Sequence, residues 1–370
     1  MKIEKVHVLH EDPYGPRIID VKTTKGTVQT PERTVTSTES NYKKRVYTFA
    51  EPYMHTVFEA IGCFNQEMVK ELHTKNAPFA RRKRELSAHV RSYSGMITKF
   101  YPQMEMNVKL TTMDIRTLID LQMESGVDLI AIPDISINSK VDVFEKHILD
   151  VARYVQSYSD AVPMPYLDMA TEEDIFRAKV DTVWDNRGTF KVMGVIYRSP
   201  SQYRGNYSYL IEKRDRDIWV HASGVNRYYP KNWLTAQMHI PQKYGIDSYS
   251  ILSRPIGGKM EQKPIEKVKR YDPKTLGIIP LWEHRQRYRN NLECNCPVCS
   301  NATLEDFIDK HVTNPHTRKK DVSLLEVWAK IHEAFASYEE FKAGRTAIKE
   351  NEFKRYFTCK EYISKIIEEL

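Results

Sequence analysis

Three of the five cysteines in this 370-residue chain lie within one six-residue segment. Cys294, Cys296 and Cys299 form a Cys-x-Cys-x-x-Cys cluster, whereas Cys63 and Cys359 are isolated. Thiolates at this spacing can hold one zinc ion from three sides, and a closed tetrahedral site then needs one more ligand. The cluster therefore predicts a structural zinc site completed by a residue from elsewhere in the chain.

Three histidines downstream of the cluster could supply the fourth ligand: His311, His316 and His332. His332 lies in residues 323–341, where its spacing from Leu325 and Phe335 places all three on the inner face of a helix. We therefore expect His332 to be the ligand, with His311 and His316 as the alternatives. Three thiolates and one imidazole leave no open coordination position, so the predicted role of the zinc is structural and not catalytic.

Predicted helices and strands alternate along the part of the chain before this site. Residues 17–38 predict a hairpin around Lys25 and Gly26 that continues into a third short strand, and residues 52–100 predict mainly helix. Helices are then expected over 111–126, 143–158 and 232–245, and strands over 127–135, 189–199, 217–225 and 246–253. Such alternation indicates parallel β/α units, and the leading fold is an α/β (β/α)8 TIM-type barrel, with an open doubly wound sheet as the alternative.

The expected domain organisation follows from this pattern. Residues 1–282 form the barrel domain with the N-terminal hairpin, residues 283–345 form a zinc-binding subdomain, and residues 346–370 form a C-terminal helix that packs on the barrel. In a barrel of this type the active site lies at the C-terminal ends of the strands. The candidate residues there are Asp134, Tyr197, Gly224 and Asp247.

The chain carries a formal net charge of +7, which is compatible with a polyanionic partner. Basic residues gather at Arg81–Arg84, Lys267–Arg270, Arg285–Arg289 and Arg318–Lys320. These runs could bind phosphate groups; for Arg81–Arg84 the alternative is a solvated helix face. The N-terminus lacks an apolar signal sequence, and the longest apolar stretch is too short to span a membrane. Because the cysteines do not form a disulfide pattern, we expect a reducing, cytoplasmic location.

Several segments resemble the tRNA-guanine transglycosylase superfamily, in the order that this family has them. They are GTVQTPERTVTST, VDLIAIPD, VHASGV, GIDSYS, CNCPVC and AKIHEAFASYEEF. CNCPVC, VHASGV and GIDSYS are most similar to the archaeal branch. The last segment resembles the helix that carries the fourth zinc ligand of the family.

This resemblance implies a double displacement at a nucleic-acid sugar, in which guanine leaves and a 7-deazaguanine base takes its place. Asp247 would be the nucleophile that forms a covalent glycosyl-enzyme. Asp134 would recognise the edge of the base, with Ser248 as a further substrate-binding residue. Tyr197 would stack on the base, and Gly224 would allow it to approach the backbone; a wall residue and a plain turn are the alternatives for these two. For Asp247 the alternative is a capping or turn aspartate after Gly245, and for Asp134 an ordinary strand-end aspartate before a loop.

The resemblance also suggests a subgroup. About forty residues follow His332, which leaves no room for the RNA-binding domains of the archaeal tRNA enzymes. The chain therefore resembles the DpdA group, whose members place 7-deazaguanines in DNA. We expect DNA as the substrate and a base such as 7-cyano-7-deazaguanine as the incoming group. The alternatives are an enzyme that acts on tRNA and an inactive, zinc-stabilised nucleic-acid-binding protein, and a homodimer is left open.

Overall fold

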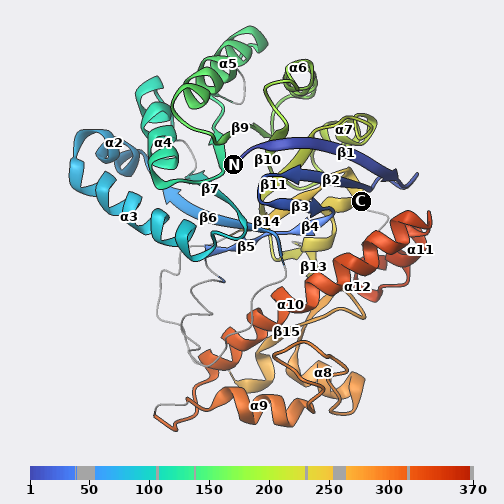
Figure 1. The fold of residues 1–370 in the computed structure, drawn as a ribbon. Coiled ribbons are helices and arrows are strands. Elements are labelled where there is room, and N and C mark those ends of the chain that lie inside the picture. Colours follow the sequence, from blue (N-terminus) through green and yellow to red (C-terminus); the bar gives the residue numbers. More distant parts are fainter. Residues whose placement is uncertain are drawn as a thin grey trace.

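A nine-stranded parallel sheet that nearly closes on itself lies at the centre of the protein (Figure 1). The computed structural model describes residues 1–37, 39, 55–105, 108–136, 139–229, 232–252, 264–314 and 317–366. The strand order is β4-β14-β11-β10-β9-β8-β7-β6-β5. The two edge strands, β4 (Glu32–Arg33) and β5 (Val35–Thr36), are separated only by Thr34. The sheet is therefore barrel-like, with one short stretch of chain serving both of its edges.

Helices cover the outside of this sheet (Figure 1). The other strands are β6 (Val57–Phe64), β7 (Ile97–Met104), β8 (Leu129–Ile132), β9 (Val162–Asp168), β10 (Val192–Ile196), β11 (Trp219–Val225) and β14 (Ser248–Ile251). The helices around them are α2 (Gln66–Thr74), α3 (Asn76–Ser92), α4 (Thr112–Ser125), α5 (Val141–Tyr158), α6 (Glu173–Asp185) and α7 (Arg204–Glu212). The predicted alternation of helices and parallel strands is confirmed over this part of the chain.

The helix predicted over residues 111–126 shows how the local sequence sets these elements. The Thr111 side chain accepts from the Asp114 backbone N–H, and the Asp114 side chain accepts from the Thr111 backbone N–H, so both form a capping box at the start of α4. Gly126 ends the helix with a φ of 76°, a conformation that glycine adopts without strain. Between them, Leu118 and Ile119 are fully buried against the sheet.

The structure confirms one further prediction and contradicts another. Residues 52–100 are mainly helical in their described part, through α2 and α3, but β6 and the start of β7 flank these helices as strands that were not expected. These strands are buried on both faces and lack the alternating pattern of half-exposed strands. The helix expected over 232–245 is replaced by β13 (Asn232–Ala236) and two short 3-10 turns, η1 (Gln237–His239) and η2 (Pro241–Tyr244). Pairing of β13 with β16 overrides its helical pattern.

An antiparallel N-terminal sheet covers the N-terminal end of the barrel-like sheet. It consists of β1 (Ile3–Glu11), β2 (Arg17–Thr23) and β3 (Gly26–Gln29), so the predicted hairpin is confirmed and β1 is an additional strand. Its apolar side chains join one core with residues from the interior of the barrel-like sheet. Ion pairs hold it in place at the strand starts: Arg17 binds Asp247 just before β14, and Lys25 binds Asp128 just before β8.

The remaining elements build a second body of structure beside the barrel-like sheet (Figure 1). A four-stranded sheet has the order β12-β13-β16-β15, with β12 (Tyr228–Tyr229), β15 (Lys269–Asp272) and β16 (Gly277–Pro280). The helices are η3 (Ile265–Lys267), α8 (Leu281–Tyr288), α9 (Leu304–Val312), α10 (Val322–Lys349), α11 (Phe353–Thr358) and α12 (Glu361–Ser364). The domain boundary predicted at residue 345 lies inside α10, which contacts β15, β1, β2 and β4. None of the described helices is long and apolar enough to cross a bilayer.

The first prediction concerns the buried ion pair beneath the barrel-like sheet. Arg17 Nη2 lies 2.6 Å from Asp247 Oδ2, and both side chains are almost completely buried. Arg17→Met leaves the carboxylate buried and unpaired, so it should lower the free energy of unfolding by about 3–5 kcal/mol. Urea denaturation followed by circular dichroism measures the change. Lys2→Met removes a cation 4.0 Å from Asp160 on the surface and is the control; equal effects of the two variants would contradict the prediction.

Candidate metal centre and polar barrel interior

The structure brings together the four side chains predicted to bind metal. The ligand atoms of Cys294, Cys296, Cys299 and His332 all lie within 4.8 Å of one another. The distances from His332 Nδ1 to the three Sγ atoms are 3.7, 3.3 and 3.4 Å, in that order. A tetrahedral zinc ion with ordinary bond lengths would separate sulfur and nitrogen by about 3.6 Å. The cluster could therefore bind one metal ion.

A tight turn of the backbone directs the three sulfur atoms to one point. The backbone N–H groups of Cys299 and Ser300 donate to Cys296 O at 3.0 and 2.9 Å, and that of Asn301 donates to Cys294 O at 3.0 Å. Ser300 and Asn301 have φ values of 50° and 57°, in the left-handed region. This region costs an ordinary residue energy, and asparagine tolerates it better than most. Metal bonds to the three cysteines that precede these residues would offset that cost.

Two residues of β15 contact the cluster: Tyr271 contacts His332, and Arg270 contacts the sulfur of Cys299. His332 Nε2 lies 2.8 Å from Tyr271 O, where an N–H donates, so Nδ1 is left unprotonated and available to a metal. Arg270 is buried, and its Nη2 lies 3.2 Å from Cys299 Sγ. Its positive charge partly offsets the negative charge of three thiolates. Arg270 thus belongs to the metal cluster and not to a phosphate-binding surface.

The alternative ligands are placed differently. His311 Nε2 lies 3.2 Å from Val298 O, and its ring packs 4.2 Å from the ring of Trp328. His311 is thus a buried histidine with its own backbone partner, outside the cluster. His316 lies outside the described residues. The structure confirms the prediction that His332, and not His311, groups with the three cysteines.

The interior of the barrel-like sheet contains a polar network that the sequence did not reveal. Glu59 of β6 contacts Lys99 of β7, and its carboxylate lies 2.9 Å from His221 Nε2 and 2.7 Å from Ser250 Oγ. All four residues are fully buried. Burial opposes ionisation of Glu59, but Lys99 and His221 outweigh it and lower its pKa to about 2. Burial together with Lys99 lowers the pKa of His221 to about 4, so His221 is neutral at pH 7.

The hydrogen bonds of this network are consistent with a neutral histidine. Trp219 Nε1 donates to Ser248 Oγ at 2.7 Å, and Ser248 Oγ lies 2.8 Å from His221 Nδ1. The Ser248 hydroxyl can therefore donate to Nδ1 while the His221 Nε2–H donates to Glu59. Ser248, predicted to bind substrate, lies inside the barrel-like sheet as part of this chain.

A second polar group lies at the C-terminal ends of the strands. Asp168 is the last residue of β9, and Arg198 follows β10. Arg198 Nε donates to Asp168 Oδ1 at 2.9 Å and its Nη2 donates to Oδ2 at 2.6 Å. The Arg198 side chain is 47% exposed and that of Asp168 is 8% exposed. This end of the barrel-like sheet, with Asp168 and Arg198, is called the barrel mouth below.

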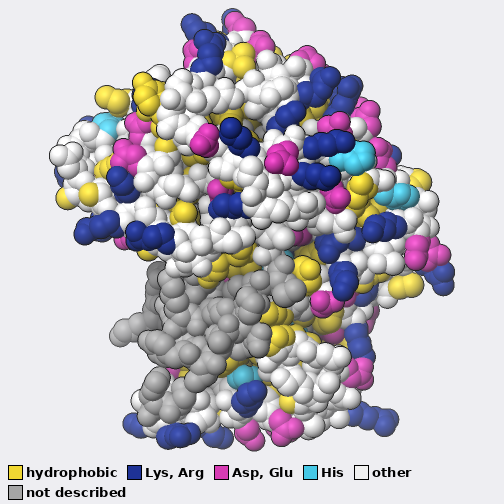
Figure 2. All heavy atoms as spheres, viewed as in Figure 1, with side chains coloured by type: hydrophobic (Ala, Val, Ile, Leu, Met, Phe, Trp, Pro, Cys, Tyr) yellow, Lys and Arg dark blue, Asp and Glu magenta, His cyan; other side chains and the backbone are white. Residues whose placement is uncertain are grey.

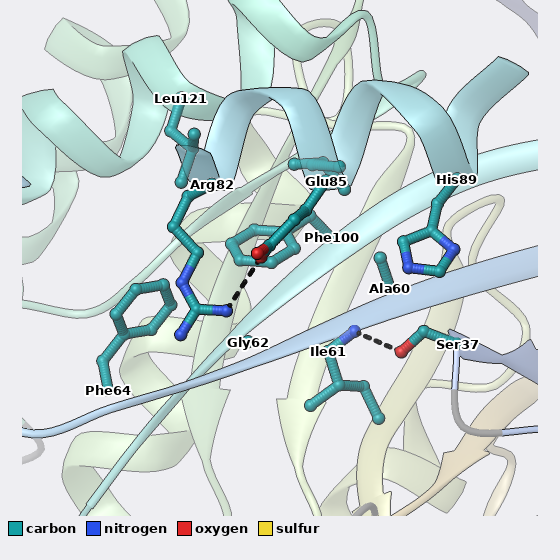
Figure 3. A pocket seen from close by; sticks show the side chains of 11 residues that line it. Ser37, Ala60, Ile61, Gly62, Phe64, Arg82, Glu85, His89, Phe100 and Leu121 are labelled. Carbon is teal, nitrogen blue, oxygen red and sulfur yellow. Dashed lines mark hydrogen bonds and ion pairs between the residues drawn. The ribbon is translucent and has the colours of Figure 1, made fainter. Parts of the chain in front are cut away.

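A pocket of about 350 Å³ lies outside the barrel-like sheet, between α3 and β6 (Figure 3). Arg82 and Glu85 extend into it from α3, and Phe64 and Phe100 line it from the strands. Its β6 residues include Ala60 and Phe64, which lie one position out of phase with Glu59 and so belong to the opposite face of the strand. The pocket is therefore separate from the barrel interior.

The four predicted strand-end residues do not form one site. Asp134 Oδ2 lies 2.6 Å from the buried Lys179 Nζ of α6, outside the barrel interior. The ring of Tyr197 packs edge-on against Tyr207 of α7 and its hydroxyl accepts from Gln237. Both side chains point to the surrounding helices.

Gly224 and Asp247 lie toward opposite ends of the barrel-like sheet. Gly224 has a φ of 83° at an irregular position near the end of β11, where only glycine adopts the backbone conformation without strain. The prediction that Asp247 lies at the C-terminal end of a strand is wrong. Its β14 begins only at Ser248, which pairs in parallel with His221, so Asp247 lies at the N-terminal end with Arg17. Whether it acts as a nucleophile stays a prediction.

Sequence reasoning missed Glu59, Lys99, His221, Asp168 and Arg198. Glu59 and Lys99 are single charges inside the apolar runs VFEAIGCF and ITKFYPQM. A lone charge within a strand that is buried on both faces must point into a polar interior or find a partner. That pattern is a signal, but it requires knowing that the segments are strands.

The second prediction concerns the fourth metal ligand. Protein purified without chelators should contain about one metal ion per chain, and His332→Ala should lower this value strongly because one of four ligands is lost. His311→Ala, which removes a neighbouring buried histidine outside the cluster, is the matched control and should retain the metal. Elemental analysis by mass spectrometry measures both. Full retention in His332→Ala would contradict the assignment.

The third prediction concerns acid stability. The folded-state pKa of His221 is about 4, below the ordinary value near 6.5, so the unfolded chain binds one more proton there between these pH values. Stability should therefore fall as the pH decreases from 6.5 toward 4, and His221→Gln should remove up to about 1.4 kcal/mol per pH unit of this slope. Urea denaturation at several pH values measures it. The exposed His7, changed to Gln, should leave the slope unchanged; an unchanged slope in His221→Gln would refute the argument.

No protein-family model matches this chain, and no curated protein is significantly similar to it. Two sites among the described residues bear on function. They are a Cys3His cluster that could bind a metal ion and a set of charged residues inside and at the mouth of a barrel-like α/β sheet.

Proposed function

We propose that this protein exchanges guanine in a nucleic acid for a 7-deazaguanine base. The observation that supports this most is the attachment of a Cys3His cluster to a barrel-like parallel sheet, in the chain order of the transglycosylases that the sequence resembles. Each feature alone is common. Together with the segment order, they favour a pentosyltransferase over other enzymes built on parallel sheets.

We propose further that the sheet is a (β/α)8 barrel and that the bound metal is zinc. The edge strands β4 and β5 are one interrupted strand, which leaves eight strand positions around the sheet. Three thiolates and one imidazole are typical of a closed structural zinc site. Such an ion would join the turn of residues 294–301 to α10, and it would take no part in the reaction.

The reaction requires an ionised carboxylate that can reach the anomeric carbon of a flipped guanosine. It also requires groups that recognise the base. Active sites of parallel barrels lie at the C-terminal ends of the strands, and the barrel mouth is that end of this sheet. Asp247 and Asp134 stay the residues that the resemblance suggests, but Asp247 would need access from the opposite end of the sheet.

The charge distribution supports a nucleic-acid partner. On the face shown in Figure 2, Lys and Arg side chains gather over α3 and near the lower end of the molecule. Arg81, Arg84, Lys267 and residues 318–320 are exposed. Some basic residues have acidic partners, such as Lys83 with Glu124. The exposed ones can contact phosphates without reading sequence. We propose DNA as the substrate and tRNA as the alternative.

One observation favours an inactive nucleic-acid-binding protein as the second candidate. The carboxylates of Glu59 and Asp247 are completely buried and fully engaged by Lys99, His221 and Arg17. Carboxylates held this way stabilise a fold and do not attack a substrate unless the site opens. An activity assay separates the two candidates.

The fourth prediction is base exchange in DNA. Purified protein incubated with labelled 7-cyano-7-deazaguanine should incorporate it into guanine-containing DNA and not into tRNA of matched amount. Single-stranded DNA should react faster, because a duplex guanine must first be flipped at a cost of a few kcal/mol. Binding should weaken steeply with salt.

The outcomes of this assay separate the candidates. Incorporation into tRNA alone would reject DNA as the substrate and keep the reaction. Incorporation into neither, with tight salt-sensitive binding to both, would support the inactive binding protein. DNA in which every guanine is replaced by adenine is the matched control and should stay unlabelled.

A further inference from the structure

We propose that Asp168, at the barrel mouth, is the carboxylate that attacks the sugar. This inference rests on the proposed function and identifies the catalytic residue, which the resemblance placed at Asp247.

The buried aspartates lie at different ends of the strands of the barrel-like sheet. Asp128 and Asp247 precede β8 and β14, and both are paired with residues of the N-terminal sheet that covers this end. Asp134 is held by the buried Lys179. Asp168 is instead the last residue of β9, at the end where parallel barrels carry their chemistry.

The two carboxylate oxygens of Asp168 differ in the number of hydrogen bonds that they accept. Asp168 Oδ1 accepts from Arg198 Nε and from the backbone N–H of Ala170, both at 2.9 Å. Oδ2 accepts only one hydrogen bond among the described residues, from Arg198 Nη2 at 2.6 Å. A carboxylate oxygen offers about two lone-pair sites, so Oδ2 has one left for a substrate. Glu59 differs, because Lys99, His221, Ser223 and Ser250 surround both of its oxygens. Asp247 does not differ in this respect, because its Oδ1 accepts only from Arg17 Nε among the described residues, so its position in the sheet is what separates it from Asp168.

At the barrel mouth, Arg198 is about half exposed, so the bidentate ion pair that orients Asp168 reaches the surface through the arginine, while the Asp168 side chain itself is 8% exposed. The Tyr101 ring stacks on the Tyr166 ring at 5.4 Å in the barrel interior. Burial, with Glu59 and Asp168 nearby, raises the pKa of the Tyr101 hydroxyl. Tyr101 therefore stays protonated and can donate a hydrogen bond to a group held above it.

The proposed steps balance as follows. Asp168 Oδ2 forms a bond to C1′ of the guanosine, the C1′–N9 bond breaks, and its electron pair leaves with guanine, which takes up one proton at N9. The incoming 7-deazaguanine then loses its N9 proton as N9 bonds to C1′. The ester bond breaks and the Asp168 carboxylate is restored. No oxidant or reductant is needed, and the proton taken up in the first step is released in the second.

The test traps the covalent intermediate. Wild-type protein is incubated with a guanine-containing single-stranded DNA oligonucleotide, and in parallel with tRNA, without any incoming base. A denaturation-stable adduct should form, and mass spectrometry of the digested adduct should place the sugar ester on the peptide that contains Asp168. Asp168→Asn should lower the exchange rate at least about 100-fold and should form no adduct, because a carboxamide cannot form the ester. A decrease of this size is typical when one positioned catalytic group is removed.

Two further variants control for folding. Asp128→Asn changes a buried, ion-paired aspartate at the opposite end of the sheet, where Lys25 Nζ lies 2.7 Å from its Oδ2. It should keep exchange and adduct formation if it folds. Asp247→Asn tests the alternative nucleophile: a folded variant that keeps exchange and adduct supports Asp168, and a folded variant that loses both overturns the assignment. Circular dichroism at the assay temperature confirms that each variant is folded.

The results separate the inference from the function. Exchange by the wild type with an ester mapped to Asp247, or exchange retained by Asp168→Asn, would overturn the assignment of Asp168 and keep the transglycosylase function. The absence of exchange and of adduct in the wild type with both nucleic acids would overturn both. An ester at Asp168 in the wild-type digest supports the assignment even if Asp168→Asn does not fold.

Discussion

Residues 32–36 form the strand on which the rest of the structure depends. The backbone N–H groups of Glu32 and Thr34 donate to the carbonyl oxygens of Asp247, just before β14, and of Tyr249, within β14, at 3.1 and 2.8 Å, while Val35 pairs with Phe58 of β6. One short stretch therefore satisfies both edges of the sheet and removes them from solvent. Because the sheet nearly closes here, the side chains of β6, β7 and β11 face one another across an enclosed interior.

The same strand connects the barrel-like sheet to the metal cluster. Arg33 is completely buried and lies between Glu39 and Glu333 of α10, with Nη1 3.7 Å from Glu333 Oε1. Arg227, which follows β11, donates to the same glutamate at 2.8 Å. Glu333 is the residue after His332, so the helix that supplies the metal ligand is also held by two arginines of the barrel-like sheet. A metal ion bound at the cluster would thus hold the same part of α10 that Arg33 and Arg227 hold through Glu333, where breaking a buried ion pair is costly.

The sequence was sufficient for those features that depend on short-range chemistry. The cysteine spacing and the helical position of His332 identified the cluster, and capping residues such as Thr111 and Gly126 marked the ends of α4. The strands β6 and β7 could not be recognised, because a strand buried on both faces has no alternating pattern and Glu59 and Lys99 resemble the charges of a helix face. The partners of these two charges are distant in sequence, so only the folded sheet brings them together.

The placement of Asp247 depends on where its strand begins. An aspartate that precedes a parallel strand lies at the opposite end of the sheet from one that follows its strand, and Asp247 precedes β14. Pairing of Ser248 with His221 puts Asp247 at the N-terminal end, which the N-terminal sheet covers and where Arg17 pairs with it, whereas Asp168 ends β9 at the C-terminal end. Both carboxylates are buried and paired with an arginine, but Arg17 is buried and Arg198 is about half exposed. The direction of the strand, and not the residue type, therefore separates the stabilising carboxylate from the one available for chemistry.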